Sequence, residues 1–305
     1  MKLINASYEI VHTDGADWSC TVYKTKEDRL EGLLHTIYKA IEIAGRTCYK
    51  SEDKITDGSA KEFVQRMIDS KHYAMLEHGT VYLVIPLDAD IAVRYTENAF
   101  SFCRVYGDNL YITTNYRVLV ENEWLDDLQY ASCYTQNHER RIIVKFICDR
   151  GVSHEFVRHR VFSFAQESTR YCNYSKDKFG NELTFIIPTK LEEYLYGDYT
   201  RREYEYHKDI ELFQSSENPD ASNFLQTLCW TESNYFTLLQ NGWKPQEARA
   251  VLPNALKTEL VMTGFVSDWK HFFELRDAKT AHPDAQALAK PLHDYFIATA
   301  LLPKQ

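Results

Sequence analysis

The chain has 305 residues, and its 44 acidic side chains outnumber its 35 basic ones to give a formal net charge of −9. This balance excludes general nucleic-acid binding driven by overall charge, so we expect any phosphate site to be a local concentration of arginine. The hydrophobic fraction of 44% is typical of a globular chain with a substantial core.

Apolar runs and cysteines indicate the compartment. No window approaches the roughly 20 apolar residues that a membrane span needs, and no signal peptide is visible at the N-terminus. The seven cysteines are odd in number and include no C-x-x-C pair, which argues against a disulfide framework or a zinc ribbon. We therefore expect a cytoplasmic protein with reduced thiols and no membrane association.

The first half of the chain alternates helical and β-rich segments. Apolar side chains recur at helical spacing over residues 27–46, which predicts a helix that ends near Gly45. Residues 60–71 predict a second helix of the same kind. Four short β-rich runs predict strands, namely Val81–Pro86, Leu110–Thr114, Ile142–Cys148 and Thr184–Pro188.

The third of these strands leads into a short helix. Ser153 is expected to cap the N-terminus of this helix, and Glu155 in its first turn suits the helix dipole. Further helices are predicted over 200–215, 219–241, 245–250, 254–264, 267–276 and 283–300. These elements indicate an α+β fold with a mixed or antiparallel sheet and flanking helices. Because no break in composition demands two domains, we expect one domain over residues 1–305.

Residues 158–171 hold the densest group of candidate functional side chains. The Arg158–Arg160 run (Arg-His-Arg) is expected at the end of the short helix, and Ser168 and Arg170 follow in an irregular loop. The planar fork of arginine suits bidentate binding of a phosphate or of the carbonyl edge of uracil. The alternative is a solvated face whose arginines form surface ion pairs.

A metal site is not expected beside this motif. His154 and His159 superficially resemble the histidines of a zinc-protease helix, but they are five residues apart. That spacing places them about 140° apart around a helix, whereas HExxH requires a spacing of four residues and a shared face.

Arg-His-Arg followed by seven residues and a serine resembles the signature of the flavin-dependent thymidylate synthases, the ThyX family. Two later segments are similar to the family in the same order. Ala248–Pro253 reads A-R-A-V-L-P, and Phe272–Arg276 reads F-F-E-L-R. The resemblance extends from about residue 30 to about residue 290 and implies a ThyX-like fold in which residues 87–140 are a family-variable insertion between strands.

The resemblance also implies an activity. A member of this family methylates dUMP to dTMP, with 5,10-methylenetetrahydrofolate as carbon donor and FAD reduced by NADPH as hydride source. Arginine would activate the uracil electrostatically, since none of the cysteines lies in a recognisable proline-cysteine nucleophile segment. The family's enzymes are homotetramers whose active sites lie between subunits.

Site residues are carried over by position. Arg276, His78 and Ser168 are implied as catalytic residues, with Arg276 polarising the uracil ring. The implied dUMP-binding residues are Glu155, Arg158, Gln166, Glu167, Ser168, Thr169, Arg170, Arg249 and Arg276. The implied contacts to the flavin cofactor are Thr80, Arg158, His159, Arg160, Gln166, His271 and His282.

The chain departs from the family pattern at several positions. Ala165-Gln166 stands where Asn-Glu is frequent, and Glu155 where glutamine is frequent. Phe265 and Ser267 fall where polar flavin contacts are expected. Two alternatives therefore stay open. One is a nucleotide- or RNA-binding module that uses its arginines and tyrosines. The other is an inactive member of the family kept for interaction.

Overall fold

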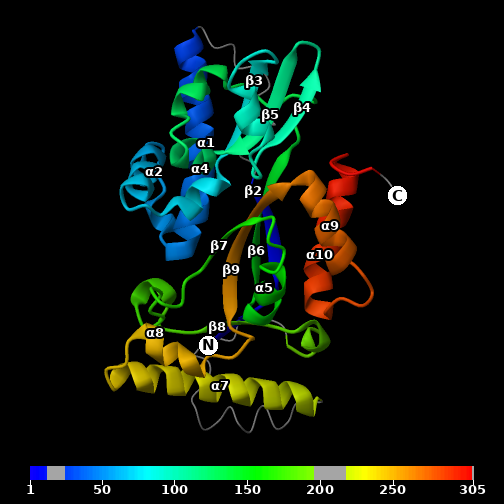
Figure 1. Ribbon diagram of the computed structural model, residues 1–305. Helices are drawn as coiled ribbons and strands as arrows, with labels where there is room; N and C mark the ends of the chain where they lie inside the picture. The colour runs from blue at the N-terminus through cyan, green and yellow to red at the C-terminus, as the bar shows by residue number, and fades with distance from the viewer. Residues whose placement is uncertain (12–24, 196–217, 304–305) are drawn as a thin grey trace.

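The computed structural model describes residues 1–11, 25–195 and 218–303 (Figure 1). Its centre is a four-stranded antiparallel sheet in the order β2-β6-β9-β7. The strands are β2 (Ser7–Val11), β6 (Arg141–Asp149), β9 (Lys257–Phe265) and β7 (Ser163–Gln166). β6 and β9 pair along their whole lengths, from Arg141 opposite Phe265 to Asp149 opposite Lys257.

Helices cover both faces of this sheet. On one face, Phe146 of β6 packs in a hydrophobic cluster with α9 (Val266–Arg276) and α10 (Pro283–Ala298). On the other face, Ile143 packs with α1 (Lys26–Tyr49). Consequently all residues of β9 except the two at its ends are buried.

A three-stranded antiparallel sheet lies at the top of Figure 1 in the order β3-β5-β4. Its strands are β3 (Thr80–Pro86), β5 (Asn109–Asn115) and β4 (Phe102–Tyr106). The core around it includes residues of α1, α2 (Ser59–Asp69), α3 (Ala92–Thr96) and α4 (Tyr116–Glu121). Residues 87–140 supply two of these strands, so this segment is packed structure. That it is a family-variable insertion stays a prediction, as does the single domain.

The lower part of the molecule contains a pair of parallel strands and a long helix. β1 (Lys2–Ile4) pairs with β8 (Thr184–Ile186), and α7 (Pro219–Gln240) lies below them and contacts α8 (Pro245–Ala248) (Figure 1). α5 (Arg150–Phe156) follows β6 directly. The short 3-10 helices are η1 (Glu52–Lys54), η2 (Tyr73–His78), η3 (Leu125–Tyr130), η4 (Asp177–Phe179), η5 (Thr189–Leu191) and η6 (Arg249–Val251).

The predicted α+β class with antiparallel sheets and flanking helices is confirmed. The four predicted strands and the helices over 27–46, 60–71, 219–241, 267–276 and 283–300 are also confirmed, while 245–250 is α8 followed by η6. The predicted helix over 200–215 lies outside the described residues. Among the residues that the structure describes, no helix is both long and apolar enough to cross a membrane.

The predicted helix over 254–264 is wrong, because Lys257–Phe265 is the inner strand β9. A strand that is buried on both faces has a nearly continuous apolar run and no alternation of apolar and polar residues. Periodicity alone does not distinguish such a run from a buried helix.

Two predicted helix boundaries are also wrong. Gly45 lies inside α1, where a Cβ atom would be 2.4 Å from Cζ of Phe63. Gly45 therefore allows α2 to pack closely against α1, and α1 continues beyond this residue. The N-cap of α5 is Asp149, whose carboxylate accepts from the backbone N–H of Val152 at 2.9 Å, so Ser153 lies within the helix.

Candidate functional site

The Arg158–Arg160 run lies in the turn between α5 and β7, just after the helix instead of inside it. Buried aromatic rings fix the turn on both sides. Phe156 packs against Phe272 with ring centroids 5.0 Å apart, and Phe162 packs against Trp269 at 4.7 Å. His159 is buried, with its ring centre 5.1 Å from that of Phe272 and 6.3 Å from that of Phe162, whereas Arg158 and Arg160 are exposed.

Arg276, the last residue of α9, is bound to this turn. Its Nε donates to Nε2 of His159 at 3.0 Å, and its Nη2 donates to the backbone carbonyl of Glu155 at 2.8 Å. Its Nη1 donates to the Glu155 carboxylate. Each nitrogen of the guanidinium thus has a partner from the motif region, which fixes the orientation of a positive charge that is 15% exposed.

His159 is neutral in this arrangement. Burial, with the charges of Arg276 and His271, lowers the pKa of His159 to about 4. Because Nε2 accepts from Arg276, the ring proton is assigned to Nδ1. A neutral imidazole orients the guanidinium without repelling it.

The second half of the motif is held from three other elements. The Glu167 carboxylate accepts from Nζ of Lys257 at 3.0 Å, and the N–H of Ser168 donates to the carbonyl of Cys48 at 3.0 Å. Nη1 of Arg249 donates to Oγ1 of Thr169 at 3.1 Å. Arg170 is exposed, with its guanidinium 5.5 Å from the ring centre of Tyr171.

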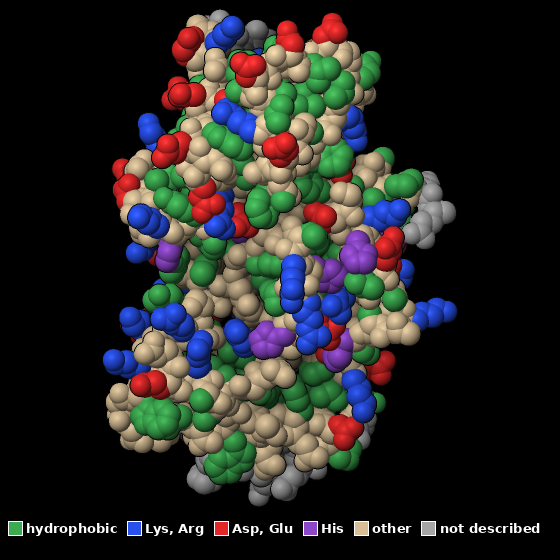
Figure 2. Space-filling model, in the orientation of Figure 1, with side chains coloured by type: hydrophobic (Ala, Val, Ile, Leu, Met, Phe, Trp, Pro, Cys, Tyr) green, Lys and Arg blue, Asp and Glu red, His purple; other side chains and the backbone are tan. Residues whose placement is uncertain are grey.

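The structure therefore brings Arg276 to the start of the motif, at His159, and Arg249 to its end, at Thr169. Figure 2 shows lysine, arginine and histidine side chains gathered across the middle of the molecule, while acidic side chains are more frequent above. A local cationic region thus exists in a chain of formal net charge −9.

His78 and Thr80 belong to a different group of residues. His78 is 0% exposed, and its Nδ1 is 2.7 Å from Oγ1 of Thr263. Burial and the charge of Arg141 lower the pKa of His78 to about 3. Thr80 accepts from Arg141 at 3.3 Å. In the described part of the chain, no hydrogen bond or ion pair joins these residues to Arg276, and a catalytic role for His78 stays a prediction.

The other predicted flavin contacts are dispersed. His271 is exposed, with its ring centre 6.3 Å from that of His159. Gln166 turns inward, because its amide donates to Oγ of Ser153 at 2.9 Å and to Oγ1 of Thr258 at 3.3 Å. His282 caps α10 by accepting from the N–H of Asp284 at 3.3 Å.

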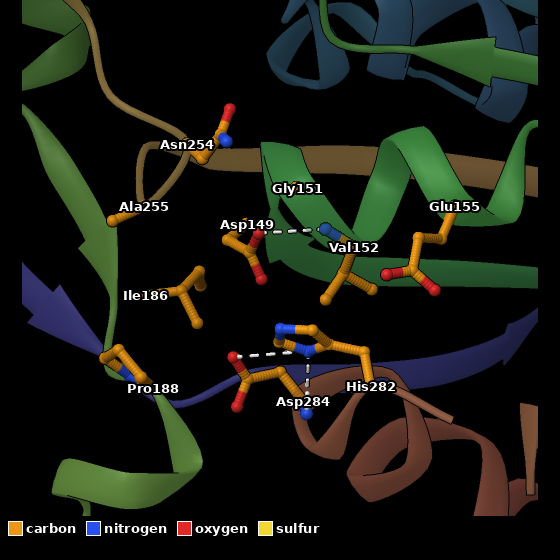
Figure 3. Close-up of a pocket in the computed structure, with 10 residues that line it drawn as sticks. All are labelled: Asp149, Gly151, Val152, Glu155, Ile186, Pro188, Asn254, Ala255, His282 and Asp284. Atoms are coloured by element: carbon orange, nitrogen blue, oxygen red, sulfur yellow. Dashed lines mark hydrogen bonds and ion pairs between the residues drawn. The ribbon is translucent and has the colours of Figure 1, made fainter. Parts of the chain in front are cut away.

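His282 and Glu155 line one cavity of about 360 Å³ (Figure 3). The full lining is Asp149, Gly151, Val152, Glu155, Ile186, Pro188, Asn254, Ala255, His282 and Asp284. Three carboxylates among these residues disfavour a phosphate here. Because Glu155 also binds Arg276, the cavity adjoins that arginine and suits a part of a ligand that carries hydrogen-bond donors.

The model of the family described as thymidylate synthase complementing protein (Thy1) matches residues 137–300 of the chain. The chain belongs to this family. The matched segment contains the Arg158–Arg160 turn, Arg249 and Arg276, which are the residues that the geometry brings together. The Thy1 match excludes the three-stranded sheet, whose strands end at Asn115.

Curated relatives of this Thy1 protein carry the name flavin-dependent thymidylate synthase. The protein of Mycobacterium avium is 24% identical over 258 residues, 82% of this chain and 71% of the relative. The protein of Pyrococcus furiosus is 29% identical over 142 residues, and that of Corynebacterium glutamicum is 33% identical over 141. These two alignments cover 47% and 46% of this chain, and the chain spans only 48% and 50% of those relatives.

Among solved structures, the UMP/dUMP methylase PolB from Streptomyces cacaoi bound with 5-Br dUMP is similar to this Thy1 chain with a TM-score of 0.41 and 16% sequence identity. The comparison covers 98% of this chain and 93% of that one.

Sequence reasoning did not find several charged residues of this region. Arg141 is 6% exposed and donates to the carbonyl of Glu77 at 3.1 Å. Lys257 and Glu259 bind the motif loop from β9, a segment that the sequence assigned to a helix. Residues two apart lie on different faces of a helix, whereas in a strand they lie on the same face. Because the sequence assigned Lys257 and Glu259 to a helix, their common role was missed.

Proposed function

We propose that this chain is a flavin-dependent thymidylate synthase that methylates C5 of dUMP. The observation that carries the proposal is the binding of Arg276 to the Arg158–Arg160 turn, through His159 and Glu155. This contact supports one site assembled from the segments that carry the family resemblance. When bound, FAD would supply the hydride after reduction by NADPH, and 5,10-methylenetetrahydrofolate would supply the carbon.

The residues present fit the anionic groups of these ligands. Arg158, Arg160, Arg170 and Arg249 are exposed at the motif, and guanidinium groups suit phosphates and pyrophosphates. Ser168 and Thr169 add a hydroxyl each within the same loop. Phe265 does not fit a polar contact, because its ring lies 5.6 Å from the Arg141 guanidinium and 6.0 Å from the ring of Phe102.

Arg276 would act on the pyrimidine. A fixed positive charge beside a uracil carbonyl stabilises the anionic resonance form and so raises the electron density at C5. Removing one preorganised donor of this type costs about 3–4 kcal/mol in other enzymes. Neutral His159 holds Nε, so that the charge faces the substrate without reorganisation during the reaction.

We further propose that dUMP lies with its phosphate at Arg170 and Arg249, and that the enzyme is a cytoplasmic homotetramer. The exposure of Arg158 and Arg160 supports sites completed by a neighbouring subunit, because exposed guanidinium groups are accessible to a second chain. In such an assembly they would bind the flavin cofactor of the neighbour.

Flavin content and tritium release from [5-³H]dUMP test this function. We expect purified protein to bind flavin and to release tritium only with NADPH and methylenetetrahydrofolate present. Arg276→Lys should lower the release rate about 100-fold or more, since lysine cannot reproduce the three-nitrogen contact, while the unfolding midpoint changes little. Colourless protein that binds oligonucleotides with steep salt dependence would instead support the RNA-binding module. An Arg276→Lys variant indistinguishable from wild type would support an inactive family member.

A further inference from the structure

Six charged side chains meet beside the motif loop and form what we call the lysine–glutamate network. Its members are Lys50, Glu52, Lys145, Glu167, Lys257 and Glu259. They come from the end of α1, from η1, from β6 and β9, and from the residue after β7. None of them belongs to the residues that the family resemblance implies, except Glu167.

Glu259 is the centre of this network. It is 6% exposed, and its carboxylate is 2.7 Å from Nζ of Lys50 and 2.6 Å from Nζ of Lys145. Lys257 is a third partner. Burial alone would raise the pKa of Glu259, but the three ammonium groups outweigh it and hold that pKa well below its usual range. Glu259 is therefore a carboxylate at neutral pH.

Lys257 joins this centre to the motif loop. Its Nζ binds Glu259 and also the Glu167 carboxylate, at 3.0 Å from the latter. The backbone N–H of Glu167 donates to the carbonyl of Glu259 at 2.8 Å, and Tyr174 donates to the second carboxylate oxygen of Glu167 at 2.9 Å. Glu167 is thus fixed at both its backbone and its side chain.

Glu167 directly precedes Ser168, Thr169 and Arg170. Ser168 is held by Cys48, two residues before Lys50 of the network, through the 3.0 Å backbone bond described above. The backbone φ of Lys50 is 47°, a left-handed conformation that ends α1 and turns its side chain to Glu259. The same network therefore fixes the loop and the segment that the loop binds.

Stability alone is a weak reason for such an arrangement. Replacing a buried ion network by apolar residues of similar volume is often neutral or stabilising, and in some proteins the polar version is kept because it specifies one geometry. In this chain the fixed geometry is that of the loop for which we propose dUMP binding. In addition, Lys257 offsets the negative charge of Glu167, which would otherwise repel a phosphate bound at Arg170, three residues along the loop.

We propose that Lys257 and Glu259 are positioning residues, which hold the Glu167–Arg170 loop in the conformation that receives the phosphate of dUMP. This inference rests on the proposed function. It adds residues from β9 that act through Glu167 and do not touch the substrate themselves.

The test compares Lys257→Met with Lys145→Met. Both variants remove one ammonium group from Glu259, and the two side chains are similarly exposed, at 15% and 18%. Only Lys257 contacts Glu167. Titration calorimetry with dUMP should show a Kd about tenfold higher for Lys257→Met and a change within about twofold for Lys145→Met. Lys257→Arg should keep most of the affinity.

Hydrogen exchange gives a second measurement. The amides of Ser168 and Cys172 should exchange faster in Lys257→Met than in Lys145→Met, because the former frees the loop. If Lys257→Met does not fold, Lys257→Gln, which keeps a hydrogen-bond donor, is measured in the same way and should show a smaller shift in the same direction.

The outcomes separate the two proposals. Equal dUMP affinity and equal loop exchange in the two methionine variants overturn the positioning role and leave the proposed function intact. If unmutated protein does not bind dUMP, both proposals fail.

Discussion

Glu155 is the residue at which this chain differs most informatively from its family resemblance. A glutamine at this position would leave the charge of Arg276 intact, whereas Glu155 binds Arg276 with a carboxylate and a backbone carbonyl. The carboxylate orients the guanidinium and also offsets part of its charge. At the residue scale, orientation and polarising strength therefore oppose each other.

Glu155→Gln should separate these two effects. The amide oxygen still accepts from Arg276, but the offsetting charge is gone, so we expect tritium release from [5-³H]dUMP to become faster by roughly threefold to tenfold. Glu155→Ala, the control, should be slower than wild type because the orientation is lost. A Glu155→Gln rate that is more than about tenfold below wild type would mean that the carboxylate acts on the substrate itself.

At the scale of elements, β9 connects most of the site. It begins with Lys257 and Glu259 of the lysine–glutamate network, and it ends where α9 begins, the helix that carries Arg276. Near its end, Gly264 lies under the ring of Phe162, two residues after the Arg158–Arg160 turn. A Cβ atom at Gly264 would be 2.5 Å from that ring. Phe162, which follows the turn, therefore packs directly on the backbone of β9 at Gly264, a position that has no side chain.

Gly264→Ala should displace Phe162. Overpacking of this kind costs about 1–3 kcal/mol, and we expect the free energy of unfolding in urea to fall by that amount. The control is Gly58→Ala, since nothing lies within 4 Å of a Cβ atom there; its cost should stay below about 1 kcal/mol. Equal losses in the two variants would show that Phe162 moves aside freely.

At the scale of the whole molecule, buried histidines couple stability to pH. His159 and His78 are neutral in the folded protein, with pKa values lowered to about 4 and about 3 mainly by burial. An unfolded histidine has a pKa near 6.5. Between about pH 6.5 and pH 4, the unfolded chain therefore binds more protons than the folded one, and the free energy of unfolding decreases as pH falls.

Between about pH 6 and the folded pKa, the free energy of unfolding should change by about 1.4 kcal/mol per pH unit for each of these two histidines. Urea denaturation at pH 7.5, 6.5, 5.5 and 4.5 measures it. His159→Gln keeps an acceptor for Arg276 and should reduce the slope by the share of one histidine, with exposed His35→Gln as the surface control. An unchanged slope in His159→Gln would contradict a neutral, buried His159.

Much of this fold was predictable because its helices are amphipathic. The apolar residues of α1, α2 and α7 lie on one side of each helix, so their spacing along the sequence predicts these helices. The sequence of β9 has no such periodic pattern, since both faces of this strand are buried. The Asp149 cap was missed for a related reason, because Asp149 and Ser153 are both good N-caps and only the path of β6 selects between them.

The sequence by itself determined which side chains are available: the Arg-His-Arg run, the serine after it, the two later arginines, and the family to which they belong. Only the tertiary structure decided which of them meet. Arg276 and His159 are 117 residues apart, and Arg249 and Thr169 are 80 apart. It also decided that His78 is buried against Thr263, and that Lys257 and Glu259 contact the loop. Such contacts depend on strand register and on the packing of layers, and local periodicity encodes neither.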